Sequence, residues 1–80
     1  MKTLDNLNIG EAAFIRDLNV DKNVKLRLLD LGFTQNALIK CVYNSPSKNP
    51  RAYLIMGSII ALRNEDAKNI LIVGDNIGIN

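Results

Sequence analysis

Alternating apolar and polar residues mark five short segments of the chain. Each has the period of two that is typical of a β-strand, or is apolar throughout. The predicted strands are Glu11–Leu18, Ala37–Asn44, Arg51–Met56, Ser58–Arg63 and Ile70–Val73. Gly57 separates the third strand from the fourth, which predicts that these two strands form a hairpin.

One further segment, Lys22–Leu31, has the signals of an α-helix. Asp21 precedes it and can accept hydrogen bonds from backbone N–H groups two or three residues further on. Gly32 follows it, where a residue in the left-handed conformation commonly ends a helix. A shorter helical turn is expected at Asn64, a good N-cap that is followed by two acidic residues.

The predicted helix carries apolar residues on two sides. At about 100° per residue, Val24, Leu28 and Leu31 share one stripe, while Leu26 and Leu29 lie nearly opposite. A helix that packs through the first stripe turns the second away from the core. We therefore expect Leu26 and Leu29 to form part of a surface that binds a partner or a second copy of the chain. The alternative is that the N-terminal segment covers them.

Turn-forming residues occupy the segments between these elements. Thr3–Gly10 is expected to be an irregular lead-in, and Asn44–Pro50, which contains both prolines, to be a surface loop. Asn36 is expected to turn the chain with a positive φ, which asparagine tolerates better than other non-glycine residues. Gly74–Asn80 is rich in glycine and asparagine. The sequence thus predicts one domain over residues 1–73 and a flexible tail over 74–80.

These elements favour a mainly β fold. About five short strands, one α-helix and a short helical turn within 80 residues predict a small barrel, because closure removes the edges that short sheets cannot protect. An SH3-like barrel fits this set of elements best. Its expected core consists of Ala13, Ile15, Val24, Leu28, Leu31, Ile39, Cys41, Tyr43, Ile55, Ile60, Leu62, Ile70 and Ile72.

The chain has more apolar residues than one face of each element can use. The surplus consists of Phe14, Leu26, Leu29, Leu38, Val42, Leu54, Met56 and Ile59. A small barrel cannot bury both faces of every strand, so some of these side chains remain at the surface. Either they are scattered, which is normal, or they form a contiguous patch that marks a binding or self-association surface.

Composition argues against a nucleic-acid partner, a secreted protein and a membrane-spanning protein. Ten Lys and Arg against eight Asp and Glu leave a net charge of +2 without any run of like charge, too weak a field to indicate nucleic acid. No charged and apolar leader opens the chain, and no apolar run approaches the roughly 20 residues that span a bilayer. A single cysteine cannot form an internal disulfide, which is typical of a cytoplasmic protein.

The missing residue types argue against catalysis. Without any histidine and with one cysteine, the chain has no imidazole for acid–base chemistry and no ligand set for tetrahedral zinc. No glycine-rich phosphate-binding motif is present. Cys41 alternates with apolar residues in a strand and is expected to be buried. We therefore predict a binding module that is not an enzyme, with no metal and no cofactor.

The order of several motifs resembles the FeoA family. The motifs are Arg27-Leu28-x-x-Leu31-Gly32, then Pro46, then Ala61-Leu62-Arg63-x-x-x-Ala67-x-x-Ile70-x-Val73, and the resemblance covers roughly Leu4 to Val73. It implies an SH3-like fold, which also forms the C-terminal domain of iron-dependent repressors. The family usually has Pro-Gly where this chain has Gln35-Asn36, and a loop glycine where this chain has Ser47–Asn49.

The resemblance implies a small cytosolic adaptor of ferrous iron uptake. FeoA proteins are partners of the membrane transporter FeoB, so the expected partner is the cytoplasmic part of a FeoB-like transporter. Arg27 and Arg63 match family positions, where arginine either grips a carboxylate or phosphate of the partner or pairs with a neighbouring acid such as Asp30 or Asp66. The predicted partner-binding residues are Leu26, Arg27, Leu29, Leu38, Val42, Leu54, Met56 and Arg63.

Two other functions remain open at this point. One is an SH3-like regulatory or dimerisation module related to the C-terminal domain of iron-dependent repressors. Against it, the free-standing chain has no helix-turn-helix and no histidine ligands. The other is an interaction module unrelated to iron. Either could involve a homo-oligomer.

Overall fold

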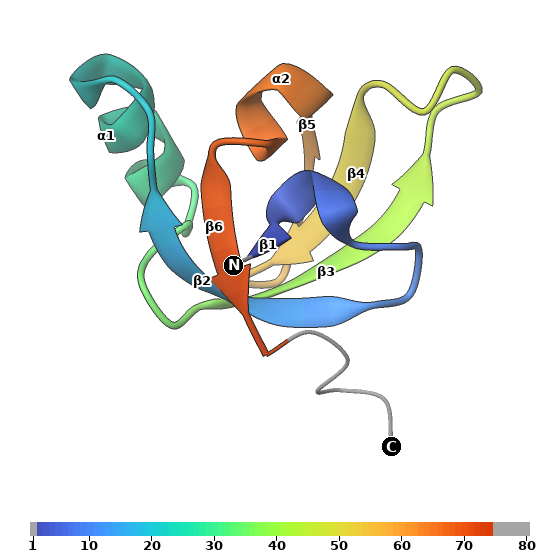
Figure 1. Ribbon diagram of the computed structural model, residues 1–80, viewed down its shortest axis with the longest axis horizontal. Helices are drawn as coiled ribbons and strands as arrows, with labels where there is room; N and C mark the ends of the chain where they lie inside the picture. The colour runs from blue at the N-terminus through green and yellow to red at the C-terminus, as the bar shows by residue number, and fades with distance from the viewer. Residues whose placement is uncertain (1, 75–80) are drawn as a thin grey trace.

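The computed structural model describes residues 2–74 and consists of one curled antiparallel sheet with three short helices (Figure 1). The strands follow the order β1-β6-β2-β3-β4-β5 across the sheet. In chain order the elements are β1 (Lys2–Thr3), the 3-10 helix η1 (Leu4–Asn6), β2 (Ala12–Leu18), α1 (Lys22–Asp30), β3 (Leu38–Asn44), β4 (Arg51–Ile55), β5 (Ser58–Leu62), α2 (Asn64–Ala67) and β6 (Ile70–Val73).

The mainly β architecture predicted from the sequence is confirmed, with one additional strand. The N-terminal segment is not an irregular lead-in, because Lys2–Thr3 pairs with β6 and Leu4–Asn6 forms η1. Figure 1 shows the sheet curving around η1, with α1 and α2 at the same end of the molecule. The predicted tail lies outside the described residues apart from Gly74.

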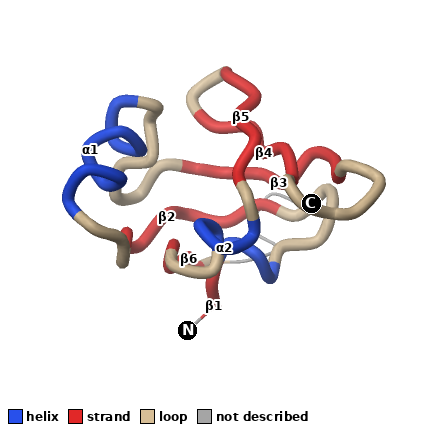
Figure 2. The backbone as a smooth tube through the Cα atoms, turned by 90° about the horizontal axis from the view of Figure 1, so that it is seen from above, coloured by secondary structure: helices blue, strands red, loops and turns tan. Residues whose placement is uncertain are grey.

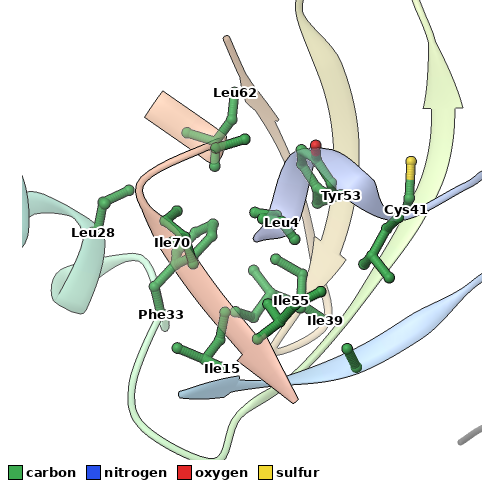
Figure 3. Packing of buried hydrophobic residues seen from close by; sticks show 14 of the residues in the cluster. Leu4, Ile15, Leu28, Phe33, Ile39, Cys41, Tyr53, Ile55, Leu62 and Ile70 are labelled. Atoms are coloured by element: carbon green, nitrogen blue, oxygen red, sulfur yellow. The ribbon is translucent and has the colours of Figure 1, made fainter. Parts of the chain in front are cut away.

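The core fills the concave side of the sheet, as Figure 3 shows for its labelled residues. Its most deeply buried side chains are Leu4, Leu7, Ile15, Phe33, Ile39, Cys41, Tyr53, Ile55, Ile70 and Ile72. Most of the predicted core is present, including buried Cys41. Val24 and Ile60 are partly buried and pack against it.

Two predicted core residues, Leu31 and Tyr43, lie at the surface instead. Leu31 is 39% exposed, because the helix ends before it and the left-handed turn at Gly32 brings Phe33 into the core. Tyr43 is 57% exposed, because a bulge between Cys41 and Tyr43 shifts the register and reverses the alternation of faces. Tyr53 of β4 is the large aromatic residue that fills the core.

The structure confirms the predicted cap of α1 and the predicted turn at Asn36, but not the predicted cap of α2. Asp21 caps α1 by accepting a hydrogen bond from the Val24 N–H over 3.0 Å. Asn36 has a φ of 71° and turns the chain between α1 and β3, as predicted. The cap of α2 was predicted wrongly, since Arg63 occupies the N-cap position and Asn64 is the first helical residue.

Arg51 ties the N-terminal segment to the sheet. Its guanidinium donates to the backbone carbonyls of Asp5, at 3.0 Å, and Leu7, and its Nε donates to Asn44 Oδ1 over 2.7 Å. The same group lies 3.1 Å from Cys41 Sγ. Burial raises the pKa of the Cys41 thiol, and the Arg51 charge opposes that shift in part. One half-buried arginine thus satisfies the carbonyls of the segment that carries Leu4 and Leu7 into the core.

Candidate functional site

Five large apolar side chains gather on the side of the sheet that faces away from the core. Each is between 37% and 73% exposed. We call this group the outer sheet face; it consists of Phe14, Leu38, Leu54, Met56 and Ile59. The group spans four neighbouring strands, β2 to β5, and the tip of the β4–β5 hairpin, so five of the eight surplus apolar residues form a contiguous patch.

Cross-strand pairing brings these residues together. Phe14 on β2 lies opposite Leu38 on β3, and Leu54 on β4 lies between Lys40 on one side and Ile59 on the other. Directly opposed side chains in such pairs have Cβ atoms about 5 Å apart. Lys40 is exposed and is the cation in the middle of the group. The three strands β3, β4 and β5 contain no acidic residue.

A groove of about 500 Å³ opens on this face. It is lined by Gly10, Ala12, Leu38, Lys40, Leu54, Met56 and Gly57. The lining combines apolar walls with one ammonium group and has no carboxylate. Such a lining can hold an apolar side chain and pair with one acidic group.

Met56 stands at the tip of the β4–β5 hairpin in an unusual backbone conformation. Met56 and Gly57 have φ values of 50° and 78°, as the two central residues of a type I′ turn require. Asparagine or glycine is favoured at the first of these positions, and a methionine there costs about 1 kcal/mol. A Cβ atom at Gly32 would lie 2.6 Å from Met56 Cγ, so that glycine provides the space that the methionine fills.

A second groove, of about 230 Å³, separates α1 from β5. We call it the helix–edge groove. It is lined by Val24, Arg27, Leu28, Leu31, Ile60, Ala61, Leu62, Arg63 and Asp66. Arg63 Nε lies 3.7 Å from Glu65 Oε2, and both side chains are 60% exposed, so this ion pair is weak. The acid that pairs with Arg63 is therefore Glu65 and not Asp66, which the sequence offered as a neighbouring acid.

The structure places five of the eight predicted partner-binding residues on these two surfaces. Leu38, Leu54 and Met56 line the groove on the outer sheet face, and Arg27 and Arg63 line the helix–edge groove. Val42 is half-buried on β3.

The two helix leucines that were expected to act together are separated. Leu26 is 52% exposed and lines neither groove. Leu29 packs against the core, so the prediction that it turns away from the core is wrong. The reason is that the side of α1 that bears Leu29 faces β2, since Leu29 lines one cavity together with Ile15 and Leu18. Lys40 lines the groove on the outer sheet face but was not among the predicted partner-binding residues. Its alternation with the buried residues Ile39 and Cys41 in β3 was the signal that could have placed it on this face.

Comparisons with known proteins identify the family. A sequence model of the FeoA domain matches residues 2–73. The chain belongs to the FeoA family. It is 35% identical over 68 residues to the Fe(2+) transport protein A of Campylobacter jejuni, covering 85% of this chain and 92% of that protein. FeoA is thus a family of ferrous iron transport, an accessory family that is not known to contain enzymes.

Solved FeoA structures share this fold. FeoA of Chlorobium tepidum superposes with a TM-score of 0.83 at 26% identity, covering 88% of this chain and 67% of that one. FeoA of Stenotrophomonas maltophilia, solved with zinc and described as a procaryotic SH3 domain protein, superposes with a TM-score of 0.77 at 25% identity, covering 91% of both chains. The predicted SH3-like fold is confirmed.

The described part of this FeoA protein lacks both a membrane-spanning helix and a cluster of metal ligands. Within residues 2–74, no helix has the length and apolar composition that crossing a membrane requires. In the same part of the chain, no three His, Cys, Asp or Glu side chains are grouped so that they could hold a metal ion. The expectation that this FeoA protein binds no metal stays a prediction.

Proposed function

We propose that this FeoA protein is a cytoplasmic adaptor that assists ferrous iron uptake by binding the cytoplasmic part of a FeoB-like transporter through its outer sheet face. The observation that carries the proposal is the contiguous apolar group Phe14, Leu38, Leu54, Met56 and Ile59 around a groove. Exposed apolar patches of this kind are characteristic of protein interaction sites.

The composition of this face favours a polypeptide over a lipid surface or a second copy. Lys40 is the cation of the groove, whereas stable attachment of a protein to anionic lipid through charge takes a cluster of about four or more cations. A twofold dimer through this face would bring Lys40 towards its own copy with no acid from β3, β4 or β5 to compensate. A partner that offers apolar side chains and a carboxylate meets both requirements.

Hairpin geometry adds independent support. Met56 keeps an exposed thioether at a turn position that local preference would give to asparagine or glycine. Residues that persist in disfavoured backbone conformations concentrate at functional sites, and methionine adapts well to irregular partner surfaces. We therefore assign Met56 as an anchor of the interface.

The test uses two leucines of equal exposure on different surfaces. Leu38→Ser, at a residue 51% exposed on the outer sheet face, should reduce binding to the purified cytoplasmic GTP-binding domain of a FeoB-like transporter by about tenfold or more. Leu26→Ser, at a residue 52% exposed on α1, is the matched control and should leave the affinity unchanged. Both variants should melt like the parent protein.

Three outcomes would overturn the proposal. Unchanged affinity in Leu38→Ser would remove the outer sheet face from the interface, and loss of affinity in Leu26→Ser alone would move the interface to α1. No binding of the parent protein to any cytoplasmic part of the transporter would reject the adaptor function. Isothermal calorimetry measures each affinity, and sedimentation velocity shows whether the free protein is a monomer.

A further inference from the structure

The sheet ends in an unprotected strand. β5 pairs with β4 on one side, and within residues 2–74 no strand pairs with its other side; Figure 2 shows it at the margin of the sheet. Its pairing with β4 runs from Ile55–Ser58 to Arg51–Leu62 without a bulge. The segment Ala52–Leu62 contains no charged residue and no proline, so it lacks the devices that usually blunt an edge strand.

The hairpin turn decides which backbone groups point outward. In a two-residue hairpin the residues that flank the turn, here Ile55 and Ser58, exchange hydrogen bonds, and the pattern then alternates along the strands. Ile59 and Ala61 consequently direct their N–H and C=O groups away from β4. These outward groups form a row that another extended backbone can match.

The helix–edge groove runs beside this row. Ile60 and Leu62 of β5 form one wall, and Leu28 and the 39% exposed Leu31 form the other. Arg27 and Arg63 come from opposite sides of the groove, while Asp66 is the one acid in its lining. A strand added to β5 would alternate its side chains between this groove and the outer face beside Ile59.

We propose that the free edge of β5 is a second binding site of this FeoA protein, which takes an extended polypeptide segment by strand addition. One apolar side chain of that segment enters the helix–edge groove, and acidic side chains on the same side pair with Arg27 and Arg63. The backbone row selects an extended segment over a helix or a small anion, since only another strand satisfies it. A second copy of β5 fits less well, because it has no acid to offer these arginines.

This site goes beyond the adaptor function proposed above and does not depend on it. Its test therefore uses a synthetic probe, the peptide acetyl-Glu-Val-Ile-Val-Glu-amide, which is titrated into the full chain and followed by the amide chemical shifts of the protein. In an extended peptide the isoleucine and both glutamates share one side. Shifts should concentrate at Ile59–Leu62 and at Arg27.

Peptide controls separate strand addition from general adhesion. One control peptide is methylated at the backbone nitrogens of both valines, and the other is methylated at the backbone nitrogen of the isoleucine, so that each lacks those hydrogen-bond donors. Because hydrogen bonding alternates along an added strand, one version should lose about tenfold or more in affinity and the other should bind like the parent. A peptide with lysines in place of both glutamates should also bind about tenfold more weakly.

Protein variants complete the test. The double variant Arg27→Glu, Arg63→Glu should bind the acidic peptide more weakly, and the lysine peptide more tightly, than the parent protein does. Ala61→Pro removes an outward N–H and blocks the edge without touching the ladder to β4, so it should abolish binding. Leu38→Ser on the outer sheet face should bind the peptide normally, which keeps the outcome separate from that of the transporter assay.

The following results would overturn the proposal. The first is that all the peptides bind with equal affinity, and the second is that millimolar peptide causes no chemical-shift changes in β5. The third is that the double arginine variant binds the peptides as the parent protein does. Concentration-dependent dimerisation that Ala61→Pro removes would instead assign the edge to a second copy. If Ala61→Pro fails to fold, the N-methylated peptides decide.

Discussion

Arg51 offers the most decisive test of how the core is held together. It is half-buried, and its guanidinium and Nε bond to the carbonyls of Asp5 and Leu7 and to the side chain of Asn44. Arg51→Met keeps an apolar stem of similar length but removes every donor. Two backbone carbonyls of the N-terminal segment then lose their partner, while Leu4 and Leu7 remain buried beside them in the core.

The expected loss is large for a protein of this size. Hydrogen bonds to a charged group are each worth about 1.5–3 kcal/mol, but part of that returns when the buried guanidinium no longer has to be desolvated. We expect Arg51→Met to lower the free energy of unfolding by about 3 kcal/mol. A chain of 80 residues has a total of about 4–12 kcal/mol, so the variant loses a quarter or more of its stability.

Urea unfolding followed by circular dichroism measures this loss directly. Arg51→Lys keeps the charge but cannot reach all the acceptors, so it should lie between the parent protein and Arg51→Met. Arg63→Ala is the matched control, because its ion pair is solvent-exposed and its loss should change stability by about 0.5 kcal/mol or less. A loss below about 1 kcal/mol in Arg51→Met would show that the N-terminal segment is held by apolar packing alone.

Four further predictions concern single positions. Asn36→Gly should leave the melting temperature unchanged or slightly raised, whereas Asn36→Val should cost about 1 kcal/mol or more, because a β-branched residue fits a φ of 71° badly; equal melting of the two would refute this account of the turn. Leu29→Ser should cost about 1–2 kcal/mol and Leu26→Ser nearly nothing, since Leu29 packs against the core; the reverse order in urea unfolding would contradict the packing. Met56→Asn should stabilise the fold by about 0.5 kcal/mol, since relief of the positive φ outweighs the little packing of a 73% exposed side chain, and it should weaken binding to the transporter domain. The buried Tyr53 hydroxyl has no hydrogen-bond partner among residues 2–74, and burial raises the pKa of this group from 10.0 to about 12. Stability should therefore fall as the pH rises from 10 towards 12, because the unfolded chain releases that proton first. Tyr53→Phe should be as stable as the parent at neutral pH and should lose less stability over this alkaline range, and an equal alkaline loss in urea unfolding would contradict the assignment.

Local chemistry in the sequence determined the elements of this protein. The alternation in Ala12–Leu18 and the Gly57 turn specify strand and hairpin through steric preferences that act within a few residues. The same holds for Asp21, whose carboxylate caps α1, and for Asn36 at positive φ. Because such preferences need no distant contact, element types and most boundaries could be predicted.

The sequence also determined part of the candidate site. The residues next to Leu38 and Leu54 along their strands point into the core, so the outward direction of these two leucines followed from the strand period alone. Their exposure depended only on each strand having one buried face. What the period could not supply was the neighbour across the sheet, such as Lys40 opposite Leu54, since pairing register is a property of two strands.

Only the tertiary structure decided which residues complete the core and which surfaces adjoin. The bulge after Cys41 turned Tyr43 outward, and the N-terminal segment entered the core through bonds to Arg51, more than 40 residues away along the chain. Arg27 and Arg63 share a groove although they lie far apart along the chain, because α1 and β5 lie on either side of it. Such contacts arise from competition among many apolar groups for one small interior, and the outcome depends on the volume and register of the whole fold rather than on any local pattern.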